Sequence, residues 1–137
     1  MAKLEGGCSC GKVRYSAEAE PIFQGVCHCT SCQKGNGSSF NAVVAIPAPA
    51  LKVTGELKQY DSKGDSGQGT HHTFCPNCGS PITGTADVMQ GVVMITVGTL
   101  DDSSWFKPAM QIYCDSKMPW VDLGGDIKSF PKMPMPG

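Results

Sequence analysis

Alternating and continuous apolar segments along the chain predict a series of short strands. Val13, Tyr15 and Ala17 alternate with polar residues, which is the pattern of a half-buried strand. Segments 40–46 and 92–97 are continuous apolar runs with the length of buried strands. Further short or extended segments are predicted at 22–26, 51–54, 57–60, 82–85 and 111–114.

Turn-forming residues separate these segments. The 17 glycines and 10 prolines are about a fifth of the 137 residues, which favours short strands over long helices. Residues 33–39 are predicted as a loop after one helical turn, and 61–69 as a surface loop. We find no repeat or linker, and expect one all-β domain over 1–130 followed by an extended, Pro-rich tail over 131–137.

Charge and hydropathy narrow the classes of partner. The net charge of −1, from 11 basic and 12 acidic residues, gives no general attraction for nucleic acid or anionic lipid. The apolar run 92–97 is too short to span a bilayer, and residues 1–7 lack the apolar segment of a secretion signal. We therefore expect a cytoplasmic protein without nucleic-acid or membrane partners, and the residues indicate no oligomeric state.

Seven of the eight cysteines fall into closely spaced clusters, and the eighth is Cys114. In a reducing compartment the thiol pools oppose structural disulfides, so the clusters favour metal ligation over disulfide bonds. The clusters are Cys8 and Cys10; Cys27, Cys29 and Cys32; and Cys75 and Cys78.

Two of the clusters have the spacing of one closed zinc site. Cys8 with Cys10, and Cys75 with Cys78, each lie on a turn followed by glycine, and two such turns supply the four sulfurs of a tetrahedral zinc. Binding of about 10–16 kcal/mol, as in zinc-finger peptides, equals the whole folding stability of a typical domain. We therefore predict a structural zinc at these four cysteines.

The remaining cluster is one ligand short of a closed site. Three thiolates from Cys27, Cys29 and Cys32 would leave a fourth position open, which distinguishes catalytic from structural zinc. We predict a second zinc here, so two per chain, with these three cysteines as the catalytic ligands. The alternative left open is that Cys114 or His28 closes the site and makes it structural.

Several other polar residues are candidates for weaker roles. His28 is the middle residue of a CxC segment, so we expect its side chain to point away from the metal, beside the ligands or at the surface. No role is assigned to His71 and His72, and Cys114 is interpreted as a buried small apolar residue. The aspartates at 101 and 102 are interpreted as turn or capping residues rather than an acid/base pair.

Five motifs together carry a family resemblance. They are GCxCGxVRY at 7–15, CHCxxCxKxxGSxF at 27–40, FCxxCGSPI at 74–82, VGTLDD at 97–102 and KMPW at 117–120. With these motifs the chain resembles the glutathione-dependent formaldehyde-activating enzyme family over residues 6–130. The resemblance implies a β-tent fold stabilised by zinc, a structural zinc on the four paired cysteines and a second zinc on the other three.

The implied activity is that of a carbon–sulfur lyase resembling S-hydroxymethylglutathione synthase. Glutathione and formaldehyde, or a similar thiol and aldehyde, would be the small-molecule partners. Family members often have arginine where this chain has His72 and histidine where it has Gln111, which bears on the identity of the substrate. The residues do not decide whether the open position takes the thiol sulfur or polarises the aldehyde oxygen.

Two other functions remain open at this stage. One is a non-catalytic zinc module that binds a protein partner. The other is a thiol redox enzyme resembling methionine sulfoxide reductase B, which would use Cys27 with Cys32, or Cys114, as redox thiols.

Overall fold

The computed structural model describes residues 2–134 and consists mostly of strands, as the sequence predicts. No helix within that range has the length and apolar character needed to cross a bilayer. The strands are β1 (Lys3–Gly7), β2 (Arg14–Glu18), β3 (Phe23–Cys27), β4 (Asn41–Pro47), β5 (Leu51–Thr54), β6 (Lys58–Lys63), β7 (Gly69–Phe74), β8 (Pro81–Ala86), β9 (Val92–Thr96), β10 (Met110–Ile112) and β11 (Lys128–Ser129). The helical segments are α1 (Thr30–Asn36) and the 3₁₀ turns η1 (Ala48–Ala50), η2 (Asp87–Met89), η3 (Val97–Thr99) and η4 (Cys114–Ser116).

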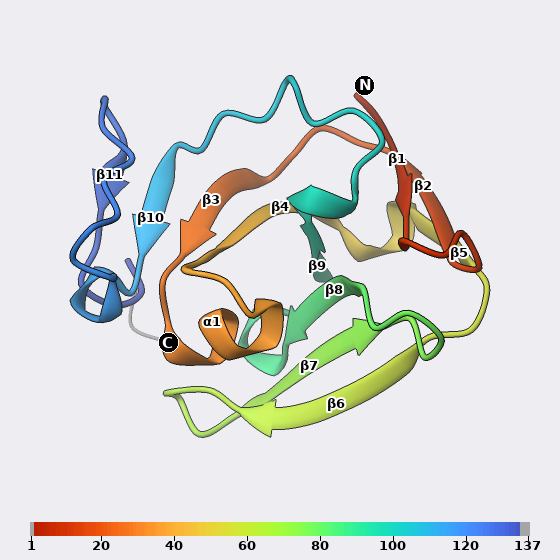
Figure 1. The fold of residues 1–137 in the computed structure, drawn as a ribbon, viewed down its shortest axis with the longest axis horizontal. Coiled ribbons are helices and arrows are strands. Elements are labelled where there is room, and N and C mark those ends of the chain that lie inside the picture. Colours follow the sequence, from red (N-terminus) through yellow and green to blue (C-terminus); the bar gives the residue numbers. More distant parts are fainter. Residues whose placement is uncertain (1, 135–137) are drawn as a thin grey trace.

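The strands form two sheets. A small sheet has the order β1-β2-β5, and a large sheet has the order β11-β10-β3-β4-β9-β8-β7-β6. Neighbouring strands are antiparallel, except that β10 runs parallel to both β3 and β11. The large sheet curves so that its β10–β3 side and its β6–β7 side lie on two sides of α1 (Figure 1). Strands that are distant in sheet order are thereby brought near one another around α1.

Apolar residues of the two sheets form the main core. Ile46 of β4, Ile82 of β8 and Ile95 of β9 are fully buried in one cluster with Leu4 of β1 and Tyr15 of β2. Each buried aliphatic side chain contributes about 1.5–3 kcal/mol through the hydrophobic effect. The apolar residues of β2 therefore face the core, as their alternation with polar residues predicts.

The prediction of a loop over 61–69 is wrong at both ends. Strand β6 continues to Lys63 and β7 begins at Gly69, so that only residues 64–68 form the turn. A hydrogen bond of 2.8 Å between the hydroxyls of Ser62 and Thr70 joins the two strands. Strand β6 is mostly exposed and β7 is mostly half-buried, and both are largely polar, so they lack the apolar periodicity by which strands are recognised.

The C-terminal part of the chain also differs from the prediction. Strand β10 ends at Ile112 rather than Cys114, and it pairs with the short strand β11. Trp120 is 72% exposed, whereas Val121 is buried. Residues 135–137 of the predicted tail lie outside the described residues.

An ionic contact on the outer strands ties β6, β7 and η2 together. The Nδ1 atom of His71 lies 2.7 Å from Asp61 Oδ1, and its Nε2 atom lies 2.9 Å from Asp87 Oδ1. Both ring nitrogens can donate only in the protonated imidazolium. The hydrogen bonds to Asp61 and then to Asp87 raise the pKa of His71 above its ordinary value of 6.5.

The contact makes a pH-dependent contribution to stability. Because the folded-state pKa of His71 is raised, the contribution is fully present below about pH 6.5 and is lost as pH rises through the folded-state pKa. We predict that the H71Q variant, with its melting temperature measured between pH 5 and pH 9, lacks the loss of stability with rising pH that this contact causes in the wild type. The control is H72Q, which changes the exposed neighbouring histidine and leaves the two contacts of His71 in place. An H71Q profile parallel to that of the wild type over this range would contradict the assignment.

Candidate metal centres

Four cysteine sulfurs from two turns far apart in the sequence converge in one group. The sulfurs of Cys8, Cys10, Cys75 and Cys78 all lie within 4.8 Å of one another. The Cys8–Cys10 and Cys10–Cys75 sulfur distances are 3.5 and 3.8 Å. A tetrahedral zinc with Zn–S bonds of about 2.3 Å requires sulfur separations of about 3.8 Å. The four sulfurs therefore fit a closed tetrahedral metal site.

Hydrogen-bond donors surround these sulfurs. The backbone N–H of Val13 donates to Cys8 Sγ at 3.2 Å, and the Ser80 hydroxyl lies 3.3 Å from Cys78 Sγ. The bond from Ser80, followed by backbone N–H donors, lowers the pKa of Cys78 to about 5. Donors that stabilise thiolates are what a metal-binding cysteine needs.

The four-sulfur cluster joins the two sheets. Its first turn lies between β1 and β2 of the small sheet, and its second lies between β7 and β8 of the large sheet. The backbone N–H of Ser9 donates to the Ser80 hydroxyl at 3.0 Å, which links the turns directly. Ser80 therefore contacts both turns, a role that its position after the CxxCG motif does not reveal.

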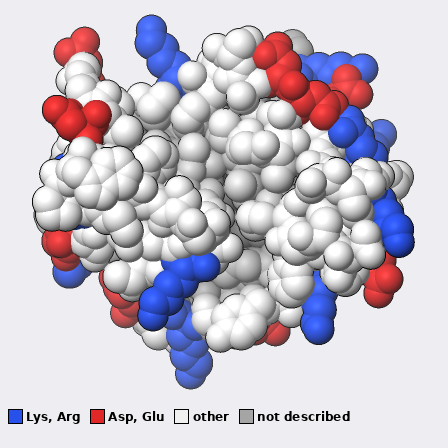
Figure 2. All heavy atoms as spheres, viewed as in Figure 1, with Lys and Arg blue, Asp and Glu red and all other residues white. Residues whose placement is uncertain are grey.

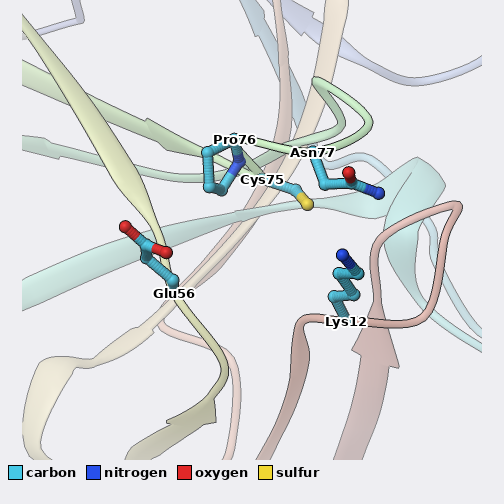
Figure 3. A pocket seen from close by; sticks show the side chains of 5 residues that line it. All are labelled: Lys12, Glu56, Cys75, Pro76 and Asn77. Carbon is cyan, nitrogen blue, oxygen red and sulfur yellow. The ribbon is translucent and has the colours of Figure 1, made fainter.

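A hollow of about 560 Å³ lies beside the four-sulfur cluster. None of its lining residues belongs to the three-sulfur cluster. Figure 3 shows Lys12 extending toward the sulfur of Cys75, with Asn77 and Pro76 next to it and Glu56 farther away. Because four sulfurs already complete the adjacent cluster, the hollow adjoins no open ligand position. We therefore place no reaction in it.

The other three clustered cysteines form a second, more buried group. The sulfurs of Cys27, Cys29 and Cys32 lie within 4.8 Å of one another, and Cys27 is buried at the end of β3. Cys29 is the N-cap of α1, and its sulfur accepts the backbone N–H of Cys32 at 3.3 Å. Within residues 2–134, no fourth His, Cys, Asp or Glu atom joins this group. The arrangement offers a metal three sulfurs and one remaining position.

Electrostatics explains why this group fits a cation. Two thiolates within 4.8 Å repel by roughly 3–4 kcal/mol at an effective dielectric of about 20, so the three sulfurs cannot all ionise unaided. The thiols of Cys27 and then Cys32 donate to Cys29 and lower its pKa, while the pKa values of Cys27 and Cys32 are raised. The sulfurs thus share the remaining protons, whose place a metal cation would take.

His28 lies between Cys27 and Cys29 in the chain. Its side chain is completely buried, which excludes the predicted surface location. Its Nε2 atom lies 2.8 Å from Gln111 Oε1, and its ring packs edge-on against Phe40. Its Nδ1 atom has no partner among the described residues. With Gln111 as the acceptor, Nε2 carries the proton, and the ring orientation is fixed.

Gln33 and Cys114 form contacts in the region around the three-sulfur group. The side-chain amide of Gln33 donates to the carbonyls of His28 and Ser116, at 2.7 and 3.0 Å, and so ties α1 to η4. Cys114 belongs to neither sulfur group, and its thiol donates to the carbonyl of Gln111 at 3.6 Å. Cys114 is half-buried, and all eight cysteines are free of disulfide bonds. The contact of Gln33 had no signal in the sequence.

The remaining predicted residues lie apart from the sulfur groups. Asp101 forms a two-pronged ion pair with Arg14, and Asp102 accepts the backbone N–H of Ser104 at 3.0 Å. Asp102 is thus the predicted turn residue, whereas Asp101 joins its turn to β2. His71 is held by two aspartates, and His72 is exposed on β7.

The face that carries α1 is hollowed at its centre. Figure 2 shows uncharged atoms across this hollow, with lysine, arginine and acidic side chains mostly around the edge of the face. No field of a single sign covers the face, in agreement with the net charge of −1. Recognition of a charged ligand here would therefore depend on individual side chains.

Comparisons with known proteins agree with this geometry. Residues 3–116 match the family described as glutathione-dependent formaldehyde-activating enzyme. A Penicillium rubens protein that carries this name is 25% identical over 109 residues, which cover 77% of this chain and 56% of the relative. An Emericella nidulans protein of the same name is 28% identical over 86 residues, covering 63% and 43%. A Schizosaccharomyces pombe protein named as a lyase is 27% identical over 82 residues, covering 60% and 57%.

A solved structure shares the fold. The crystal structure of a Rhodobacter sphaeroides protein matches with a TM-score of 0.58 and 20% identity, covering 71% of this chain and 87% of that one. The chain spans about half the length of the curated relatives that it matches. The family match includes all seven clustered cysteines, and the chain belongs to the glutathione-dependent formaldehyde-activating enzyme family.

Proposed function

We propose that this protein is a zinc-dependent carbon–sulfur lyase that interconverts glutathione and formaldehyde with S-hydroxymethylglutathione. The observation that supports this most strongly is the convergence of Cys27, Cys29 and Cys32 without a fourth ligand among the described residues. An incomplete ligand set is typical of catalytic rather than structural zinc. The names of the relatives suggest the substrates.

The proposed reaction forms one carbon–sulfur bond. The sulfur of glutathione attacks the carbonyl carbon of formaldehyde, and the thiol proton ends on the former carbonyl oxygen, so that no oxidant or reductant is needed. A free thiol with a pKa near 8.5 is only a few per cent ionised at pH 7. Zinc bound by Cys27, Cys29 and Cys32 would supply a Lewis acid that favours the thiolate and polarises the aldehyde.

The protein's own residues orient this site. The backbone of Cys29 begins α1, so the helix fixes the spacing between Cys29 and Cys32. The ring of His28, which follows Cys27 in the chain, is fully buried and is fixed by Gln111. A substrate thiol would bind at the position that the three sulfurs leave free.

Two substitutions relative to many family members affect the substrate proposal. Gln111 replaces a frequent histidine, and its amide is already engaged, with its oxygen on His28 and its nitrogen 2.9 Å from Ser129 Oγ. His72 replaces a frequent arginine and is exposed on β7. The carboxylates of glutathione would then need other partners, so the thiol and the aldehyde must both be tested.

The four-sulfur site should act as a structural element. We predict that C10S, which removes an exposed ligand without opening the core, loses one of two zincs and lowers the melting temperature by more than about 10 °C. Metal analysis and calorimetry measure both effects. The control S9A lies between the ligands, keeps the backbone bond to Ser80 and should retain both zincs. A C10S protein with wild-type zinc content and melting temperature would contradict the structural role.

The three-sulfur site should act in catalysis. We predict that C32S keeps the fold and the first zinc but loses about 100-fold or more of the rate acceleration. NMR exchange between glutathione, formaldehyde and the adduct measures the rate above the uncatalysed reaction. The control C114S alters a cysteine outside both groups and should retain activity. Wild-type turnover by folded C32S would exclude catalysis at this cluster.

A further inference from the structure

The peptide groups on both sides of His28 are held by neighbouring elements. Its N–H, in the peptide that joins it to Cys27, donates to the Ile112 carbonyl of β10 at 3.0 Å. Its carbonyl, in the peptide that joins it to Cys29, accepts from the side-chain amide of Gln33 in α1 at 2.7 Å. These two peptides determine the directions in which the side chains of Cys27 and Cys29 leave the backbone. The three-sulfur group therefore depends on how His28 is held, although His28 supplies none of its atoms.

The side chain of His28 is held as firmly as its backbone. Its ring is completely buried and packs edge-on against Phe40, with the ring centroids 5.6 Å apart. Its Nε2 atom lies 2.8 Å from Gln111 Oε1. The residue between two of the clustered cysteines is thus fixed at both peptides and at its ring.

Gln111 is itself fixed by the C-terminal strand. Gln111 and Ser129 are register partners in the parallel pair of β10 and β11, and Gln111 Nε2 donates to Ser129 Oγ at 2.9 Å. The strands β11, β10 and β3 lie side by side at one end of the large sheet (Figure 1). Ser129, Gln111 and His28 thus form a hydrogen-bonded series across three strands, which we term the relay.

Burial determines the direction of the hydrogen bonds in the relay. With the amide nitrogen of Gln111 on Ser129, its oxygen accepts from Nε2 of His28, and Nδ1 keeps a lone pair. The reverse orientation of the amide would move the proton of the ring to Nδ1, which is buried and has no partner among residues 2–134. Buried N–H groups without an acceptor are rare in native proteins. Gln111 therefore accepts from His28 and donates to Ser129.

The relay brings a distant segment to the support of the three-sulfur group. Ser129 lies outside residues 3–116, over which the chain matches its family. Backbone bonds from Phe130 N–H to the Gln111 carbonyl and from Cys114 N–H to the Phe130 carbonyl, both of 3.0 Å, attach the same segment to β10 and η4. Residues that orient the ligands affect a metal site nearly as much as the ligands do.

We propose that the relay from Ser129 through Gln111 to His28 positions the CxC turn for binding of the second zinc. This rests on the part of the proposed function in which the three-sulfur group binds zinc, and it adds β11 to the support of that site. None of the three residues belongs to the sulfur group, so they act as positioning residues that set the affinity for the metal.

Zinc affinity tests the relay. Gln111 is half-buried and Ser129 is exposed, so both can be changed without opening the core. Competition with a zinc chelator measures how tightly each zinc is held. We expect Q111L to hold the zinc that C32S loses about 10-fold more weakly, and S129A to show a smaller loss, while the other zinc is held as in the wild type.

A conservative variant and a matched control separate the relay from general effects of substitution. Q111E provides a carboxylate that can accept from both His28 and Ser129, so it should restore the affinity that Q111L loses. The control K128A changes an exposed residue of the same strand outside the relay and should bind both zincs as the wild type does.

Nitrogen NMR of the histidine rings provides a readout that general destabilisation would not change. The chain has three histidines, so the resonances of His28 can be assigned by substitution of the other two. We expect a proton on Nε2 and none on Nδ1 in the wild type and in Q111E. In Q111L, which lacks the acceptor, we expect the proton to exchange between the two nitrogens.

The contrary outcomes are distinct. Q111L with wild-type affinity for both zincs would overturn the relay, as would an equal loss of both zincs or a Q111E protein as weak as Q111L. A proton on Nδ1 of His28 in the wild type would also overturn it. A wild-type protein that binds a single zinc would instead overturn the zinc site of the proposed function, and this inference with it.

Discussion

The convergence of seven thiols into two groups is the constraint on which the structure depends. Sulfurs within 4.8 Å of one another cannot all be thiolates without a cation. In the four-sulfur group this requirement joins a turn of the small sheet to a turn of the large sheet. In the three-sulfur group only three protein sulfurs converge, so a metal held there would have one position free for a further ligand.

The fold positions the three-sulfur group through elements that contribute no ligand. Strand β10 pairs in parallel with β3, so the residues after Ile112 lie beside the cysteine turn. Gln33 ties α1 to η4, and the curved sheet carries the β6–β7 turn to the same place. The site is therefore assembled from both sides of one curved sheet, although all three ligands lie within six residues.

The parts of this arrangement that sequence could predict are local. The CxC and CxxC spacings determine how the sulfurs on one turn converge. The alternation of apolar and polar residues around Tyr15 indicates which face of the strand is buried. The polar strand ends on either side of the 64–68 turn carry no apolar periodicity, so residues 61–63 and 69 were included in the predicted loop. The left-handed Tyr113 and the contact of Gln33 with Ser116 arise from segments far apart in the chain, and no local preference encodes them. The grouping of the cysteines was thus predictable from the sequence, and the surroundings of the groups were not.

The difference between a closed and an open site is the central claim, and X-ray absorption at the zinc edge measures it directly. With both sites loaded, four sulfurs at one zinc and three at the other give a mean of about 3.5 sulfurs per zinc, and the open position should hold a lighter atom. Saturation with glutathione should raise the mean to about 4 if its sulfur takes that position. A mean of four sulfurs before any thiol is added would show that the second site is already closed, and would contradict the account.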